Sequence, residues 1–190
     1  MDLGISARVL VRPFRTYASI HDAALNEFPT LVGGALRLLF VIGAFVAFTA
    51  TGRLAPFELV VAMGSYAYVP IAQFLALSIA VRAVTRKVPL RRAFALYLVG
   101  HGPWFLMLLG IAAACLLAPA PATVLFAVLP KAIPLTFLWS GILTFACMKR
   151  GLGFSGGRAA VCLLIYLVSL PLLVLGYFVA MGQLVPLFRH

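Results

Sequence analysis

The chain is 190 residues long, 64% hydrophobic and only 10% charged, whereas a soluble globular domain carries about 25% charged residues. This composition excludes an ordinary soluble domain and indicates an integral membrane protein. The formal net charge is +11. The basic residues lie in short gaps between apolar segments, which argues against nucleic-acid binding and predicts that they anchor the topology beside anionic lipids.

Residues 1–27 are predicted to form an N-terminal cytoplasmic segment with an amphipathic helix. The helix is expected to begin at Pro13, because proline is well tolerated at the first helical position. Its apolar stripe recurs at spacings of three and four and consists of Phe14, Tyr17, Ala18, His21, Ala24, Leu25 and Phe28. Two placements are open: the helix lies in the lipid headgroup region as an interfacial helix, or it packs on the cytoplasmic face of the protein itself.

Residues 28–190 are predicted to form a transmembrane domain of five helices. The spans are expected at about 28–51, 57–84, 93–117, 122–148 and 159–181. The second span exceeds the roughly 20 residues that cross the hydrocarbon, and Pro70 is its expected bend point because proline removes a backbone hydrogen bond. The predicted fold class is therefore all-α, a bundle of five transmembrane helices with an N-terminal amphipathic interfacial helix.

The basic residues are distributed unequally between the two sides of the predicted bundle. Eleven lie in the N-terminal segment and in the loops after the second and fourth spans, whereas only Arg53 and Arg189 lie on the other side. Because positive loops stay in the cytoplasm, we expect a cytoplasmic N-terminus and an external C-terminus. Arginine outnumbers lysine twelve to three, which hints at a GC-rich bacterial genome and hence a bacterial inner membrane.

His101 is the first candidate functional residue, because it is the only histidine inside a predicted span. It lies between Gly100 and Gly102 and just before Pro103, a second candidate position. An ionisable side chain within a membrane is costly and suggests a function, such as proton transfer, contact with a quinone or ligation of a haem. A bis-histidine haem lacks its second buried histidine, so a hydrogen bond to a neighbouring helix is favoured.

Lys131 is a further candidate, predicted to lie within the fourth span. A buried lysine needs a partner, and Glu58, at the start of the second span, is the only acid near any span. The two alternatives are a Lys131–Glu58 ion pair and a lysine that extends to water at the membrane surface.

The loop after the fourth span matches the pattern G-x-G-x-x-G at residues 151–156. A dinucleotide site requires a preceding strand and a βαβ unit, and neither is predicted. Seven basic residues of the two cytoplasmic loops are instead candidates for binding lipid headgroups: Arg86, Lys87, Arg91, Arg92, Lys149, Arg150 and Arg158. With four carboxylates in the chain and no metal-ligand spacing, we predict no enzyme activity, cofactor or metal.

Three stretches carry a resemblance to a known family. Residues 12–20 look like a proline-containing amphipathic segment before a first span, residues 88–94 like a segment leading into a third span, and residues 97–103 like a Tyr or Gly followed by Pro within it. In these features the chain resembles the Yip family of five-span membrane proteins, bacterial type. The resemblance implies the fold. It does not imply a role with Rab-type GTPases, because the Asp-Leu-Tyr-Gly-Pro motif of eukaryotic members is absent.

The predicted function is that of a non-enzymatic scaffold, assembly factor or accessory subunit of a membrane protein complex. Its expected partners are membrane lipids and either other integral membrane proteins or a second copy of the chain. Small residues four apart suit close helix packing, as in Gly43/Ala47, Gly110/Ala114 and Gly176/Ala180. The alternative is a small transporter or channel that uses proline-broken helices with His101 and Lys131.

Overall fold

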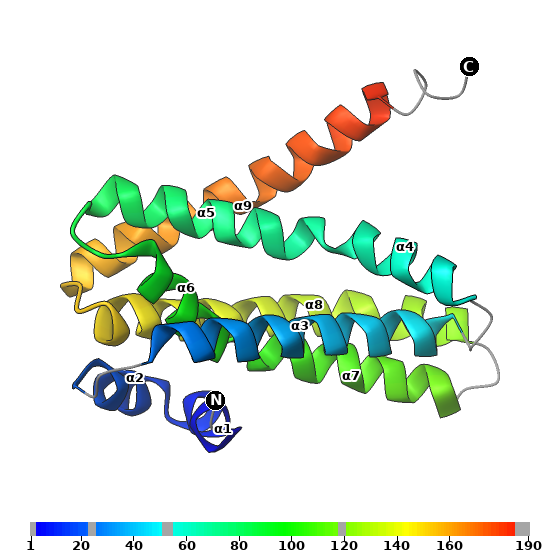
Figure 1. Cartoon of the computed structure of the whole chain (residues 1–190), viewed down its shortest axis with the longest axis horizontal. Coiled ribbons are helices and arrows are strands. Elements are labelled where there is room, and N and C mark those ends of the chain that lie inside the picture. Colours follow the sequence, from blue (N-terminus) through cyan, green and yellow to red (C-terminus); the bar gives the residue numbers. More distant parts are fainter. Residues whose placement is uncertain (1–2, 23–25, 51–54, 118–120, 185–190) are drawn as a thin grey trace.

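The structure is a computed structural model that describes residues 3–22, 26–50, 55–117 and 121–184. These ranges are almost entirely helical and contain no strand (Figure 1). The predicted all-α fold class is therefore confirmed.

The N-terminal segment holds two helices rather than one. Helix α1 (Leu3–Val11) precedes α2 (Pro13–Asp22), and Arg12 lies between them. The predicted start at Pro13 is confirmed, whereas α1 was not predicted. The stripe does not continue as far as expected, because α2 ends at Asp22, residues 23–25 lie outside the described residues, and Phe28 belongs to the next helix.

The predicted spans correspond to seven helices, two of the spans being broken. These helices are α3 (Glu27–Thr49), α4 (Pro56–Tyr66), α5 (Tyr68–Val84), α6 (Leu90–Val99), α7 (Gly102–Leu117), α8 (Pro121–Ala146) and α9 (Gly156–Leu184). A π-helical turn, η1 (Cys147–Gly151), extends α8. Among the described residues, four stretches are long and apolar enough to cross a membrane, and α6 with α7 makes a fifth if the bent pair is one span.

The break between α4 and α5 lies at Ala67, about one turn before the predicted bend point Pro70. A proline lacks the amide that would bond the carbonyl four residues earlier, and its ring clashes with that carbonyl. For Pro70 that residue is Tyr66, the last residue of α4. The amide of Ala67 instead donates to the Gly64 carbonyl at 3.0 Å. The proline therefore acts as predicted, but the bend is displaced toward the N-terminus.

The break between α6 and α7 follows the same rule. Pro103 lies four residues after Val99, the last residue of α6, and the two helices are bent by 44°. The amide of Gly100 turns to the Tyr97 carbonyl at 3.0 Å. His101 therefore lies within a helix break. The prolines inside α8 and α9 leave those helices continuous.

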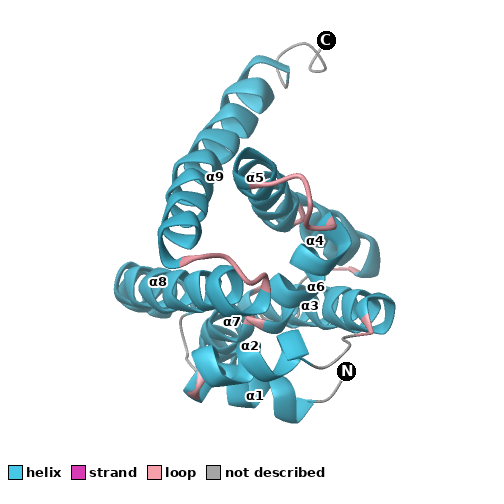
Figure 2. Cartoon of the chain, turned by 90° about the vertical axis from the view of Figure 1, so that its left-hand side faces the viewer, coloured by secondary structure: helices cyan, strands magenta, loops and turns pink. Residues whose placement is uncertain are grey.

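The helices form two layers with the N-terminal pair beneath them (Figures 1 and 2). Helices α3, α7 and α8 lie side by side, and α5 packs most extensively on α9 in the second layer. The second half of α9, orange to red in Figure 1, leaves the bundle at an angle. Helix α1 contacts α7, and α2 contacts η1 and α8.

Of the two open placements for the N-terminal segment, the structure favours packing on the protein. Tyr17 of α2 is completely buried, and its hydroxyl donates to the Leu96 carbonyl at 3.1 Å. Arg37 of α3 donates to the Ser6 hydroxyl of α1 at 3.0 Å. Both N-terminal helices are thus attached to the bundle by polar contacts as well as apolar ones.

The glycines that flank His101 allow this close approach. A Cβ atom added at Gly100 would lie 2.6 Å from the Tyr17 hydroxyl oxygen, and one added at Gly102 would lie 2.7 Å from Leu10 Cδ2. Real Cβ atoms essentially never come this close to another heavy atom. The sequence Gly-His-Gly is therefore explained by the seating of α1 and α2 on the break.

We predict that Gly100→Ala displaces the Tyr17 hydroxyl and leaves the Leu96 carbonyl without its partner. The expected loss is about 1–3 kcal/mol in the free energy of unfolding, the usual cost of a buried unsatisfied group. Unfolding by denaturant in detergent, and the rate of protease cleavage within residues 1–22, measure it. The matched control is Gly110→Ala, where an added Cβ meets nothing within 4 Å. Equal stability of the two variants would contradict the prediction.

Candidate functional site: a buried polar cluster at the helix break

His101 is buried, with 4% of its surface exposed. Its Nε2 atom lies 3.0 Å from Oε1 of Gln73, a buried residue of α5. The predicted hydrogen bond from His101 to a neighbouring helix is therefore confirmed. Its partner was not singled out from the sequence, because nothing in the spacing of these residues shows that α5 lies beside the break.

The tautomer of His101 follows from its partners. The Gln73 oxygen is only an acceptor, so His101 Nε2 carries the hydrogen and donates it. Nδ1 lies 3.4 Å from the Tyr97 carbonyl, longer than an ordinary hydrogen bond. Because Nε2 is engaged by Gln73, this arrangement offers no support for ligation of a haem iron.

A second buried pair joins the break to α9. The hydroxyl groups of Tyr97 and Tyr166 are hydrogen-bonded to each other, and both residues are buried. The Tyr97 ring also meets the His101 ring edge to face, with 4.6 Å between the centroids. The two polar pairs thus connect α5 and α9 to the same turn of the broken span.

A third set of polar groups comes from α7 and α8. Trp104 Nε1 donates to Ser140 Oγ at 3.0 Å, and Thr144 Oγ1 donates to the Ser140 carbonyl at 2.8 Å. These three residues, with Gln73 and Tyr166, line a cavity of about 10 Å³. That is about the space one water molecule requires. The Gln73 side chain is part of this lining, so its amide group borders the space that such a water would occupy.

The break also leaves the Leu96 carbonyl without its partner in the helix, and α2 supplies another donor. The amide of Gly100 would bond the Leu96 carbonyl in a regular helix, but it turns to Tyr97 instead. The Tyr17 hydroxyl takes its place. Burial raises the pKa of this phenol well above its usual value, and the neighbouring thiol of Cys147 adds to the shift. Tyr17 therefore stays protonated and keeps donating over the physiological range.

The predicted pair between Lys131 and Glu58 is wrong. Both side chains are exposed, and no ion pair joins them in the part of the chain that the structure describes. Glu58 instead accepts from the amide of Ala55 at 3.0 Å, at the start of α4. An acid in the first turn of a helix is stabilised by the free amides there, and this local contact accounts for Glu58. Pro103 is buried beside His101 and opens α7.

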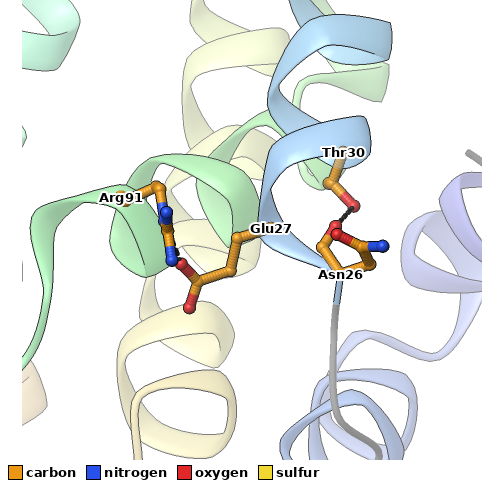
Figure 3. A network of polar contacts seen from close by, with 4 residues as sticks. All are labelled: Asn26, Glu27, Thr30 and Arg91. Carbon is orange, nitrogen blue, oxygen red and sulfur yellow. Dashed lines mark hydrogen bonds and ion pairs between the residues drawn. The ribbon is translucent and has the colours of Figure 1, made fainter.

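Two of the seven predicted headgroup residues make contacts within the protein. Arg91 Nε donates to Glu27 Oε2 at 2.6 Å, which ties α6 to the first turn of α3 (Figure 3). Arg92 lies 3.5 Å from the His21 carbonyl. His21 Nδ1 in turn lies 2.9 Å from the Gly151 carbonyl of η1 and donates to it. The sequence did not indicate these roles for Glu27 and His21.

The other five predicted headgroup residues surround the same end of the bundle. Arg86, Lys87, Arg150 and Arg158 are exposed, and the Lys149 ammonium lies 5.9 Å from the centre of the Phe145 ring.

In the described ranges no group of three His, Cys, Asp or Glu side chains is close enough to hold a metal ion. The chemistry that the polar cluster offers is hydrogen bonding and the retention of water.

Comparison with known proteins adds no assignment. No family model, no curated protein and no solved structure matches this chain. The resemblance to the Yip family therefore stays a prediction, and the site is interpreted from its geometry alone.

We predict that Gln73 and His101 are energetically coupled. In a double-mutant cycle with Gln73→Leu and His101→Ala, the coupling energy should be about 0.6 kcal/mol, the average for hydrogen bonds between membrane helices, and at most about 1.7 kcal/mol. Reversible unfolding in detergent supplies the four free energies. Ser78→Ala is the control on α5, because the Ser78 hydroxyl bonds the Phe74 carbonyl of its own helix at 2.8 Å. It should show no coupling to His101, and a coupling as large as that of Gln73 would contradict the assignment.

Proposed function

We propose that the protein is a non-enzymatic scaffold, assembly factor or accessory subunit that works through contacts between membrane helices. Its partners are lipids and other integral membrane proteins or a second copy of the chain. The observation that carries the proposal is a face of α9 that has small residues and that no other described part of the chain covers.

Gly176 and Ala180 lie one turn apart on this face, and both are exposed. A Cβ atom added at Gly176 would meet nothing within 4 Å. Glycine inside a helix costs about 1 kcal/mol relative to alanine. Gly176 shares its open position with Gly64, Gly110 and Gly141, but it lies in the half of α9 that leaves the bundle. By contrast, Gly43 already packs against Met63 of α4, at 3.3 Å from a Cβ position. Close approach by a partner helix accounts for Gly176.

The course of α9 supports the same proposal. Tyr177 stacks on Tyr68 of α5 with 4.4 Å between ring centroids. The second half of the helix leaves the bundle at an angle, as Figure 1 shows. Its exposed side chains include Leu172, Leu175 and Val179. This half of α9 is thus covered on one side only, and its apolar faces are open to lipid or to another helix.

The proposed location is a bacterial inner membrane with a cytoplasmic N-terminus. Several helices are long and apolar enough to span a membrane. The basic loop after α5, the η1 turn and the N-terminal helices lie toward the same end of the bundle (Figure 1). This grouping supports the positive-inside orientation, and the Yip-like layout of five spans is consistent with it.

We predict that the C-terminus lies outside the cytoplasm, so that a reporter enzyme that works only there is active when fused to it. Five spans place the two termini on opposite sides of the membrane, whereas four spans with a re-entrant α6–α7 pair would place them on the same side. Paired fusions of alkaline phosphatase, which is active only outside, and a fluorescent protein that matures only in the cytoplasm provide the measurement. A fluorescent C-terminal fusion would overturn the five-span proposal.

A small transporter or channel is the second candidate function. It is favoured by the helix break at His101 and by the water-sized cavity beside Gln73, since broken helices form binding sites in transporters. Lys131, which the sequence associated with this function, is exposed on α8. Solute flux into liposomes that contain this protein alone, and its loss with His101→Ala, would favour this candidate over the subunit.

We predict that Gly176→Leu disrupts the partner complex without unfolding the protein. The monomer has open space at this position, so the new side chain blocks a partner helix and little else. Co-purification in mild detergent should show at least a several-fold loss of the partner or of the second copy. Gly157→Leu is the control, because it adds the same side chain at another open glycine of α9. Equal retention of the partner by both variants would contradict the proposal.

A further inference from the structure

An apolar groove of about 590 Å³ lies between α1, α7 and α8. Aliphatic and aromatic side chains form most of its wall, and Thr136, one of its few polar residues, is itself buried. The lining residues are Leu10 and Val11 of α1, Pro103, Leu106 and Met107 of α7, and Ala132, Leu135, Thr136 and Trp139 of α8.

The groove runs along the bundle from α1 toward the opposite end. Helices α7 and α8 are antiparallel, and the Trp104–Ser140 hydrogen bond fixes their register beside the break. Trp139 therefore lies near α1, and Ala132 lies about 10 Å farther along at 1.5 Å per residue. The groove thus begins under α1 and continues between two apolar helices.

The helix at the mouth of the groove is basic. Arg8 lies in α1 and Arg12 directly follows the helix, with its amide bonded to the Arg8 carbonyl at 2.8 Å. Both side chains are exposed, and Arg8 Nε donates to the Gly4 carbonyl at 3.1 Å. Val11 lines the groove with 78% of its surface exposed. No acidic residue occurs in α1. A basic amphipathic segment prefers the headgroup level of a membrane, which places the far end of the groove at the level of the acyl chains.

We propose that this groove binds one acyl chain of an anionic phospholipid whose phosphate lies beside Arg8 and Arg12. The apolar wall matches the chain, and the two positive charges of Arg8 and Arg12 attract a phosphate. A zwitterionic lipid would fill the groove equally well but would carry a positive group to the same arginines. The charge at the mouth therefore selects the anionic lipid.

A single hydrocarbon chain fits the shape of the groove. It is much thinner than an α-helix, which is about 10–12 Å across with its side chains, and it can follow the groove without displacing α1.

The test is native mass spectrometry of the whole protein, titrated with phosphatidylglycerol or phosphatidylcholine after delipidation. We expect one phosphatidylglycerol to be retained at least several-fold more strongly than phosphatidylcholine. Ala132→Trp, which fills the groove, should abolish that retention. Ala127→Trp is the matched control, because Ala127 is exposed on the same helix and does not line the groove. Arg8→Gln with Arg12→Gln should keep lipid binding but remove the preference for phosphatidylglycerol.

Two outcomes would overturn the proposal. One is equal retention of both lipids by the unaltered protein. The other is a preference that survives the Arg8 and Arg12 changes but is lost when Arg86 and Lys87 are replaced by glutamine, which would move the site to the loop after α5. A second measurement needs no variant: phosphatidylglycerol with a photoreactive acyl chain should label peptides containing Met107 or Leu135. Labelling elsewhere only would also overturn it.

Discussion

The backbone amide that Pro103 lacks is the constraint on which the rest of the structure depends. Its absence ends α6 at Val99 and allows α7 to start in a new direction. In a membrane each backbone polar group needs a partner within the protein. The Tyr17 hydroxyl satisfies the Leu96 carbonyl, and the His101 side chain, which projects from the break, is held by Gln73. The interruption of one helix thus sets the positions of α2 and α5.

The break between α6 and α7 is the place where three other helices are attached. Contacts from α2, α5 and α9 converge on a single turn of the chain. An interhelical hydrogen bond contributes only about 0.6 kcal/mol on average in a membrane, but leaving its groups unpaired in hydrocarbon costs several times more. The polar contacts therefore favour this arrangement of the helices. Other arrangements could pack the apolar faces nearly as well, but they would leave these polar groups unpaired.

The sequence predicts the elements better than it predicts their contacts. Apolar length and proline positions show the spans, the helix start at Pro13 and the bend near Pro70, because these depend on neighbouring residues. The break before Pro103 was not predicted, and the prolines inside α8 and α9 leave those helices continuous. Gln73 lies 28 residues from His101, and Tyr17 lies 79 residues from Leu96, so their pairing depends on which helices become neighbours. The prediction of an ion pair between Lys131 and Glu58 was wrong for a related reason. Glu58 was chosen because no other partner for Lys131 was in view, whereas its carboxylate accepts a hydrogen bond from Ala55 at the start of its own helix.

The hydrogen bond from His21 to Gly151 has a consequence for the order of assembly during synthesis. Helix α2 is among the first elements to leave the ribosome, yet its contact surface is completed only when residue 151 has been made. At about 5–20 residues per second, the intervening chain takes about 6–26 s to appear. During that time the buried site that Tyr17 and Ile20 enter is incomplete, because Cys147 and Met148 form part of it. Helix α2 therefore reaches its final position late, after η1 has been made.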